Sequence, residues 1–141
     1  EDYTAWRRHT WRKMEAVMDA CHGSCILRQP DIRRIVADAL LFFEGQRSSM
    51  HGFVVMPNHV HLLATFPNKA SMLEQCDSWK HFTSREINRK VGTKGKFWQT
   101  DAFDHLVRHE AQYQRLLSYI AENPAMARLK NGESIVWAKP K

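Results

Sequence analysis

The chain has 141 residues, 43% of them hydrophobic and 26% charged, and carries a formal net charge of +6 at pH 7. This composition is ordinary for one soluble globular domain, and no apolar run approaches the roughly 20 residues that cross a bilayer. An odd number of cysteines (Cys21, Cys25 and Cys76) and the lack of a secretory leader argue against a secreted, disulfide-bonded protein, so a cytoplasmic location is expected. The positive charge favours polyanionic partners.

The first segment, residues 4–20, is expected to form a helix. Its apolar side chains keep roughly helical spacing at Trp11, Met14, Val17, Met18 and Cys21. Cys21 and Cys25 could bind zinc together with His22, but no second cluster with suitable spacing follows.

A second helix is predicted from Pro30 and Asp31, because proline is tolerated in a first turn and an acid there suits the helix dipole. Gly45 lies near its end. The expected buried face consists of Ile32, Ile35, Val36, Ala39, Leu40 and Phe43.

Two β-rich runs follow, at 51–56 and 60–66, on either side of Pro57-Asn58, which is typical of a tight turn. His59-Val60-His61 opens the second run. Because successive side chains of a strand point to opposite faces, His59 and His61 project to the same side. The predicted hairpin therefore presents two imidazoles to one metal ion.

Residues 71–90 are predicted to form a third helix, which the stretch from Gly92 to Gly95 breaks. A basic segment with interleaved aromatic rings covers its second half and the residues after it. The candidate nucleic-acid contacts in this basic segment are Lys80, His81, Arg85, Arg89, Lys90, Lys94, Lys96 and Trp98. Cations neutralise phosphates and rings stack on unpaired bases, which suits single-stranded nucleic acid; a solvated helix face with core aromatics is the alternative.

A short strand around 103–108 is expected to precede a fourth helix from about Glu110 to Asn123, with Pro124 marking its end. Its apolar stripe, predicted to pack on the sheet, is Tyr113, Leu116, Leu117 and Ile120. Tyr119 and Asn123 lie four residues apart at the edge of this stripe, so a hydroxyl and an amide oxygen share one flank. Trp137 is expected to pack the C-terminal tail onto the domain.

Taken together, these motifs resemble the REP-associated tyrosine transposases, which are single-tyrosine HUH (histidine, hydrophobic residue, histidine) transposases. The resemblance is carried by residues 54–63 with His-Val-His, Ser78-Trp79-Lys80, Phe97-Trp98-Gln99, Asp104-His105 with Arg108, and Tyr119-Ile120 with Asn123-Pro124. It implies an α+β, ferredoxin-like or RRM-like antiparallel sheet with helices packed on it and the HUH strand in a central position. It also implies cleavage and rejoining of single-stranded DNA near palindromic repeat hairpins, by a tyrosine that becomes attached to a 5′ phosphate.

Carried over position by position, His59 and His61 match the metal-binding histidines, Tyr119 matches the nucleophile, and Asn123 matches a third ligand. Such a mixed nitrogen and oxygen site suits Mg²⁺ or Mn²⁺. Arg108 and the basic segment are expected to face the DNA. The expected partner is single-stranded or hairpin DNA, bound by a monomer or homodimer without membrane contact, in a bacterial cytoplasm and associated with the nucleoid.

One departure from the pattern concerns the first segment. Members begin with a β-strand ahead of the first helix, whereas the helix expected at 4–20 leaves no such strand. Residues 1–141 are therefore expected to form a single HUH domain that lacks its first strand and has one unsupported sheet edge. Two alternatives remain open: a non-catalytic, domesticated nucleic-acid-binding module on the same topology, and a metal-dependent hydrolase in which water attacks.

Overall fold

A computed structural model describes residues 12–21, 25–42, 44–100, 103–130 and 132–140. In chain order, these residues form β1 (Arg12–Asp19), η1 (Ile26–Arg28), α2 (Pro30–Phe42), β2 (Ser49–Val55), β3 (His59–Phe66), α3 (Lys69–Val91), β4 (Phe103–Leu106), α4 (Glu110–Met126) and β5 (Ile135–Ala138). The strands make one antiparallel sheet in the order β4-β1-β3-β2-β5. The series from β1 to β4 has the ferredoxin-like arrangement, and α4 and β5 follow it. The predicted α+β fold is confirmed.

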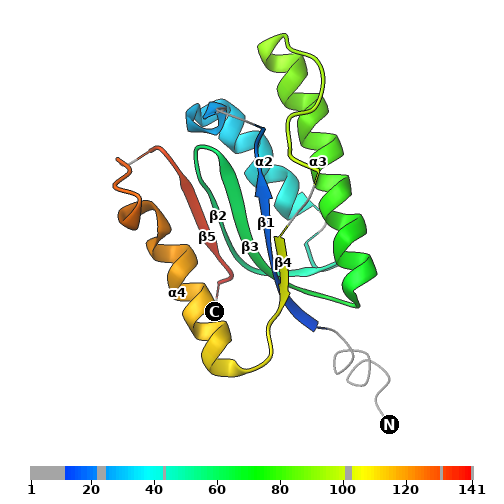
Figure 1. The fold of residues 1–141 in the computed structure, drawn as a ribbon, viewed down its shortest axis with the longest axis vertical. Coiled ribbons are helices and arrows are strands. Elements are labelled where there is room, and N and C mark those ends of the chain that lie inside the picture. The colour runs from blue at the N-terminus through cyan, green and yellow to red at the C-terminus, as the bar shows by residue number, and fades with distance from the viewer. Residues whose placement is uncertain (1–11, 22–24, 43, 101–102, 131, 141) are drawn as a thin grey trace.

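Helices cover both faces of the sheet, with α2 and α3 on one side and α4 on the other (Figure 1). The larger core lies under α2 and α3, where Met18, Phe53 and Leu62 are fully buried. A smaller core under α4 joins Val54, Met56 and Leu63 to Ile120. Because side chains alternate along a strand, the residues between those of the larger core point toward α4. No helix in the described ranges combines the length and apolarity needed to cross a bilayer.

The first described element corrects the sequence analysis. Residues 12–19 form the strand β1 rather than part of a helix, and β1 lies between β3 and β4. Met14, Ala16 and Met18 alternate toward the larger core. The spacing of three and four residues at the apolar positions imitated a helix, but the buried set repeats every second residue. A strand therefore precedes α2, and the expectation of a missing first strand was wrong. Residues 4–11 of that expected helix, Trp11 among them, lie outside the described residues.

The predicted hairpin is confirmed. β2 and β3 are joined by a turn in which the Met56 N–H donates to the carbonyl of His59 at 2.8 Å. The pairing of β2 shifts between Met50 and Gly52, which is a bulge that puts an extra residue on the α4 side. A Cβ at Gly52 would lie 3.3 Å from the Leu117 side chain, so glycine lets α4 approach the sheet closely here.

The helices begin and end as local chemistry dictates. The Asn68 side chain caps α3 by accepting from the Ser71 N–H, and Gly92 ends it in the left-handed conformation. The helix predicted to begin at Pro30, the helix predicted at 71–90 and the strand predicted near 103 are all present, and α2 ends at Phe42. The end predicted for the fourth helix was wrong, because α4 continues through Pro124 to Met126. Proline removes one backbone donor, and here the surrounding packing tolerates that loss.

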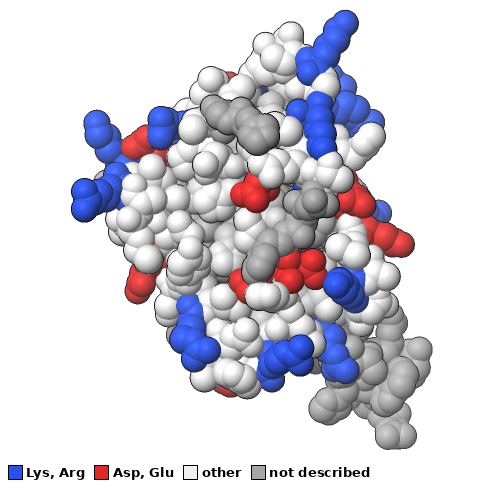
Figure 2. Space-filling view, in the orientation of Figure 1, with Lys and Arg blue, Asp and Glu red and all other residues white. Residues whose placement is uncertain are grey.

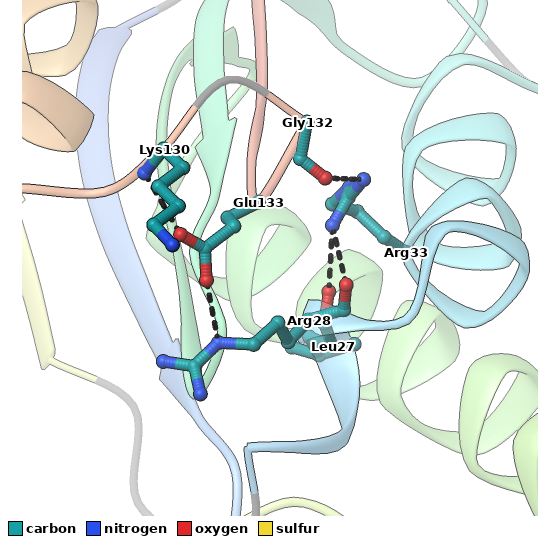
Figure 3. Close-up of polar contacts among 6 residues, drawn as sticks. All are labelled: Leu27, Arg28, Arg33, Lys130, Gly132 and Glu133. Carbon is teal, nitrogen blue, oxygen red and sulfur yellow. Dashed lines mark hydrogen bonds and ion pairs between the residues drawn. The ribbon is translucent and has the colours of Figure 1, made fainter.

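The sequence analysis missed the strand β5. Contacts of β5 itself and of the segment before it hold this strand in place. Trp137 stacks on Phe53 with ring centroids 5.6 Å apart, which agrees with the packing role expected for it. The segment before β5 is tied to η1 and α2, where Arg33 donates to the carbonyls of Leu27, Arg28 and Gly132 (Figure 3). Beside it, Arg28 forms an ion pair with Glu133 at 2.9 Å. We call this group of contacts the C-terminal clamp.

We expect His51 to make the stability of the fold depend on pH. Its Nε2 lies 2.6 Å from the Thr65 hydroxyl, and burial, followed by the nearby Lys13 and Lys139, lowers the pKa of His51 from 6.5 to about 4. The unfolded chain therefore takes up a proton before the folded chain does. The stabilisation is fully present above pH 6.5 and is lost as the pH falls toward 4.

This loss is expected to be about 1–2 kcal/mol, less than the full pKa shift implies because solvent screens a half-exposed site. The measurement is urea unfolding at pH 7 and pH 5 for the wild type and for His51→Gln. The wild type is expected to lose more free energy of unfolding between the two values than the variant does. An equal loss in both proteins would show that His51 does not carry the effect.

Candidate active site

The two predicted histidines lie on β3, the central strand of the sheet, on the face that α4 covers. β3 runs from His59 to Phe66, and its alternate residues Val60 and Leu62 belong to the larger core on the opposite face. His61 is buried with 5% of its surface exposed, whereas His59 is partly exposed at the start of the strand. The predicted shared orientation of the two imidazoles follows from this alternation.

The predicted nucleophile lies against one of these histidines. The ring of Tyr119 on α4 is 5.5 Å from the ring of His61, centroid to centroid, with an interplanar angle of 63°. Tyr119 is nevertheless 46% exposed and borders an open hollow of about 710 Å³ that Arg115 and Glu122 also line. The phenol can therefore meet a large substrate from outside while it contacts the buried imidazole.

Asn123 lies one turn beyond Tyr119 and is buried, with 8% of its surface exposed. Its side-chain amide forms no hydrogen bond with any other residue in the described ranges, so its oxygen is available to a ligand. The structure thus brings Tyr119 to His61. No hydrogen bond, ion pair or ring contact within the described chain joins His59 or Asn123 to that pair.

The sequence analysis did not single out Glu15 on β1, which contacts one of the candidate histidines. Its Oε2 lies 2.9 Å from Nε2 of His61, and its Oε1 lies 3.2 Å from Nδ1 of His105 on β4. Glu15 is 7% exposed. The expected helix at 4–20 hid this residue, because only a strand places it on the same face as the histidines. An acid alternating with Met14 and Ala16 was the signal that could have found it.

His59 is kept neutral by its surroundings. Burial lowers the pKa of His59 from its ordinary value of 6.5, and His61 lowers it further, while the carboxylate of Asp19 opposes the shift. Its Nδ1 lies 2.9 Å from the Asn58 side-chain oxygen, which fixes the ring and leaves Nε2 for another partner. An imidazole with a lowered pKa keeps a free lone pair in mildly acidic solution, which suits a metal ligand.

The chemistry of the donor atoms indicates which cation the site could hold. Within the described residues, no group of three His, Cys, Asp or Glu side chains is arranged to hold a metal. Two imidazoles and an amide oxygen nevertheless form the mixed nitrogen and oxygen set that Mn²⁺ or Mg²⁺ accepts, with positions left for water and phosphate. No thiolate is present, since the described cysteines lie elsewhere: Cys76 is buried on α3, and burial raises the pKa of its thiol to about 12.

Four cations of the basic segment bond to other groups of the chain. The Lys80 ammonium donates to the Gln99 carbonyl at 2.9 Å, Lys96 donates to the Thr100 hydroxyl, and Lys90 pairs with Asp31. Arg89 forms an ion pair with Glu86 at 3.2 Å. The remaining predicted contacts on this segment, His81, Arg85 and Lys94, are exposed, as is Arg108 before α4.

Trp98 does not occupy the position expected of a DNA-stacking residue. It is 2% exposed, and its indole N–H donates to the Thr83 hydroxyl at 2.8 Å. Its ring is part of the core, which was the alternative weighed for the aromatics of this segment. Backbone hydrogen bonds join the same stretch to β1, with the Gln99 N–H donating to the Asp19 carbonyl at 2.8 Å.

The site and the basic segment meet at one end of the molecule. In Figure 1 the β2–β3 turn and the C-terminal end of α3 lie toward the top, and the later half of α4 lies at mid-height on the left. Asp19, which receives the bond from Gln99, is the register partner of His59. Figure 2, in the orientation of Figure 1, shows acidic side chains over the middle of the visible face and at its right edge, with lysines and arginines mostly around the edges. A polyanion would therefore contact the lysines and arginines at the edges of this face, and a cation would be attracted to the acidic side chains in its middle.

The chain resembles known proteins in its sequence and in its fold. The sequence profile of a family described as "Transposase IS200 like" matches residues 31–123. A comparison with curated proteins found no match.

Among solved structures, a REP-associated tyrosine transposase bound to a REP hairpin matches with a TM-score of 0.61 and 19% identity, over 82% of this chain and 68% of the other. A transposase candidate from Deinococcus radiodurans R1 matches with a TM-score of 0.54 and 15% identity, over 79% of this chain and 90% of the other. At such identities these two likenesses establish the fold.

Proposed function

Because the chain belongs to the family of IS200-like transposases, we propose that it cleaves single-stranded DNA and transfers the cut strand through a covalent bond to Tyr119. The observation that carries this proposal is the contact between the exposed Tyr119 ring and the buried His61 ring. Cleavage beside palindromic hairpins is supported by the fold neighbour that was solved with a REP hairpin.

The proposed reaction is a transesterification. The Tyr119 hydroxyl oxygen attacks a backbone phosphorus, a tyrosyl O–P bond forms, and the bond from phosphorus to the 3′ oxygen breaks. The phenolic proton is lost to solvent, and the leaving 3′ oxygen takes up a proton to become a free hydroxyl. One phosphate ester replaces another, so a 3′-hydroxyl can reverse the step without ATP. A tyrosine phenol, with an ordinary pKa near 10, needs help to lose its proton at neutral pH.

His59, His61 and Asn123 would hold a divalent cation beside Tyr119, with Mg²⁺ and Mn²⁺ the proposed ions. A cation held there would supply positive charge opposite a phosphate oxygen and opposite the charge that develops on the phenol oxygen. His61 is fixed in the sheet, and α4 holds Tyr119 against it, so the chain supplies the orientation. The low pKa of His59 keeps its ring able to act as a ligand.

The DNA would approach from the end of the molecule where the basic segment meets the site. Arg85, Lys94 and Arg108 are exposed and are proposed to contact backbone phosphates. Lys80 is proposed to act indirectly, because its bond to the Gln99 carbonyl holds the stretch that pairs with the end of β1. A protein with this activity would work on chromosomal DNA in the cytoplasm, bound to the nucleoid.

The proposal is tested with an oligonucleotide that carries a hairpin and a single-stranded flank, labelled at either end in separate reactions. With Mn²⁺ or Mg²⁺, the label on the 3′ side of the cut is expected to migrate with the protein in a denaturing gel. The label on the 5′ side is expected to appear as a free fragment that ends in a 3′-hydroxyl. Removal of the divalent ion with EDTA is expected to stop both products, and restoring Mn²⁺ is expected to recover them.

The same gel separates the alternatives. A water-attacking hydrolase would give two free fragments and no protein-bound label. A non-catalytic binding module would retard the DNA in a native gel and leave it intact. Either outcome, across a set of hairpin sequences that the protein binds, would overturn the proposed transesterase.

A further inference from the structure

A row of polar side chains crosses the α4 face of the sheet, at the end opposite the β2–β3 turn. Lys13 on β1, Thr65 on β3 and Ser49 on β2 are register partners on three neighbouring strands. Register partners lie side by side on one face of a sheet. His51, at the β2 bulge, joins this row because its Nε2 lies 2.6 Å from the Thr65 hydroxyl.

Two ammonium groups lie at this row. The Lys139 ammonium donates to the Ser49 hydroxyl at 2.6 Å, and the Lys13 ammonium lies 4.4 Å from the ring centroid of Tyr113 on α4. Within the described residues, neither lysine forms an ion pair with a carboxylate. Each ammonium has three N–H donors, so both keep donors for a further acceptor. We call Lys13, His51 and Lys139 the lysine cluster.

The lysine cluster has an excess of positive charge. Burial lowers the pKa of His51 to about 4, and the charges of Lys13 and Lys139 contribute to this shift. The carboxylate of Glu44 opposes the shift, but it already accepts hydrogen bonds from two backbone N–H groups. An anion bound between the two ammonium groups would offset their repulsion.

The lysine cluster and the candidate nucleophile lie along the same helix. Tyr113 packs against His51 with ring centroids 5.3 Å apart, and Tyr119, six residues later on α4, packs against His61 at 5.5 Å. Six residues of an α-helix span about 9 Å. A stacked DNA strand advances about 3.4 Å per nucleotide, so this span corresponds to roughly three nucleotides.

Further positive charge lies at the same end of the molecule. The Val107 N–H donates to the Lys13 carbonyl at 2.9 Å, so the exposed Arg108 follows directly beside β1. Figure 2 shows lysines and arginines along the lower edge of the molecule, where α4 begins in Figure 1. A DNA strand that runs along α4 from Tyr119 would therefore meet positive charge here.

We propose that the lysine cluster binds a backbone phosphate of the DNA, a few nucleotides from the phosphate that Tyr119 attacks. This inference rests on the proposed function and adds a second point at which the strand is held. Two ammonium groups supply the charge and the N–H donors that a phosphate binds. Phosphate contacts position DNA without reading its sequence. The cluster would therefore help to determine which phosphodiester reaches Tyr119.

The test measures binding of a hairpin oligonucleotide with a single-stranded flank by fluorescence anisotropy, in EDTA and over a series of salt concentrations. Lys13→Gln and Lys139→Gln are each expected to weaken binding about three- to tenfold at low salt, and to lower the slope of log affinity against log salt by about 1. The matched control is Arg34→Gln, which removes the same charge from α2 on the opposite face of the sheet. The control is expected to stay within about twofold of the wild type.

Urea unfolding checks that each variant is folded. Wild-type affinity and salt slope in folded Lys13→Gln and Lys139→Gln would overturn the proposal. An equal loss in Arg34→Gln would also overturn it, because net charge alone would then explain the effect.

If the lysine variants do not fold, NMR titration of the His51 ring in the wild type provides the second measurement. A phosphate bound beside the two lysines offsets their charge, so the pKa of His51 is expected to rise when the oligonucleotide is added. An unchanged pKa would overturn the proposal. Inorganic phosphate is the second probe: a rise with inorganic phosphate but not with saturating oligonucleotide would show a site for a small anion and would also overturn it.

The two proposals fail separately, because binding in EDTA requires neither a divalent ion nor a covalent bond. A protein that binds DNA through Lys13 and Lys139 but never forms an adduct would refute the transesterase alone. A protein that forms the adduct while both lysine variants bind DNA normally would refute the phosphate site alone.

Discussion

Replacement of Tyr119 by phenylalanine is expected to abolish the covalent protein–DNA adduct. The variant loses only the hydroxyl oxygen, and its ring can keep the contact with His61, 5.5 Å away. Because Tyr119 is exposed on α4, the loss of its hydroxyl leaves no buried group without a partner. Removal of a nucleophile lowers the rate of such a step by several orders of magnitude, here at least about 10³-fold. The measurement is protein-bound label in a denaturing gel after reaction with Mn²⁺.

The matched control is Tyr113→Phe, two turns earlier on the same helix. The ring of Tyr113 packs against His51 with centroids 5.3 Å apart, and the Lys13 ammonium lies 4.4 Å from the ring centroid. Burial raises the pKa of Tyr113, which makes it a poorer nucleophile. This variant is expected to form the adduct at the wild-type level. Adduct formation by Tyr119→Phe, or its loss in Tyr113→Phe alone, would contradict the assignment.

The second large effect is expected from the C-terminal clamp. Arg33→Ala removes the donors that bind the Leu27, Arg28 and Gly132 carbonyls and so weakens the link from the segment before β5 to η1 and α2, where the Arg28–Glu133 ion pair remains (Figure 3). Hydrogen bonds from a charged donor contribute more than neutral ones, and the variant leaves these three carbonyls without this partner. We expect the free energy of unfolding to fall by about 2–4 kcal/mol.

Urea unfolding at pH 7 measures this loss, and the neighbouring Arg34 provides the control. Its guanidinium is 65% exposed and lies 4.0 Å from Asp38, a surface pair of little value. Arg34→Ala is expected to change the free energy of unfolding by less than about 0.5 kcal/mol. Equal effects of the two substitutions would show that the clamp does not stabilise the fold.

Much of the fold was predictable because its patterns are local. The hairpin that carries His59 and His61 alternates clearly around Pro57-Asn58, and α2 begins at a proline followed by an acid, as expected. The apolar stripe of α4 also packs on the sheet as predicted, with Ile120 buried in the smaller core. In each case one residue period and one turn signal determine the element.

The errors arose where two patterns competed or where a signal was weak. β1 was mistaken for a helix because Met14, Val17 and Met18 keep helical spacing, whereas the buried residues Met14, Ala16 and Met18 repeat every second position. β5 was missed because four residues carry too little alternation, and its pairing with β2 is a long-range contact. The contact between Tyr119 and His61 was anticipated from the resemblance, whereas Glu15 needed the strand pairing to bring β1, β3 and β4 together.

The sheet order also bears on how two copies of the chain could associate. The outermost strands are β4 and β5, and each has only four residues. A short edge offers few free backbone groups, so adding a strand from a second molecule would gain little hydrogen bonding. Within the described chain, self-association by extending the sheet is therefore unfavourable, and a homodimer would have to form through helices or through a shared DNA hairpin.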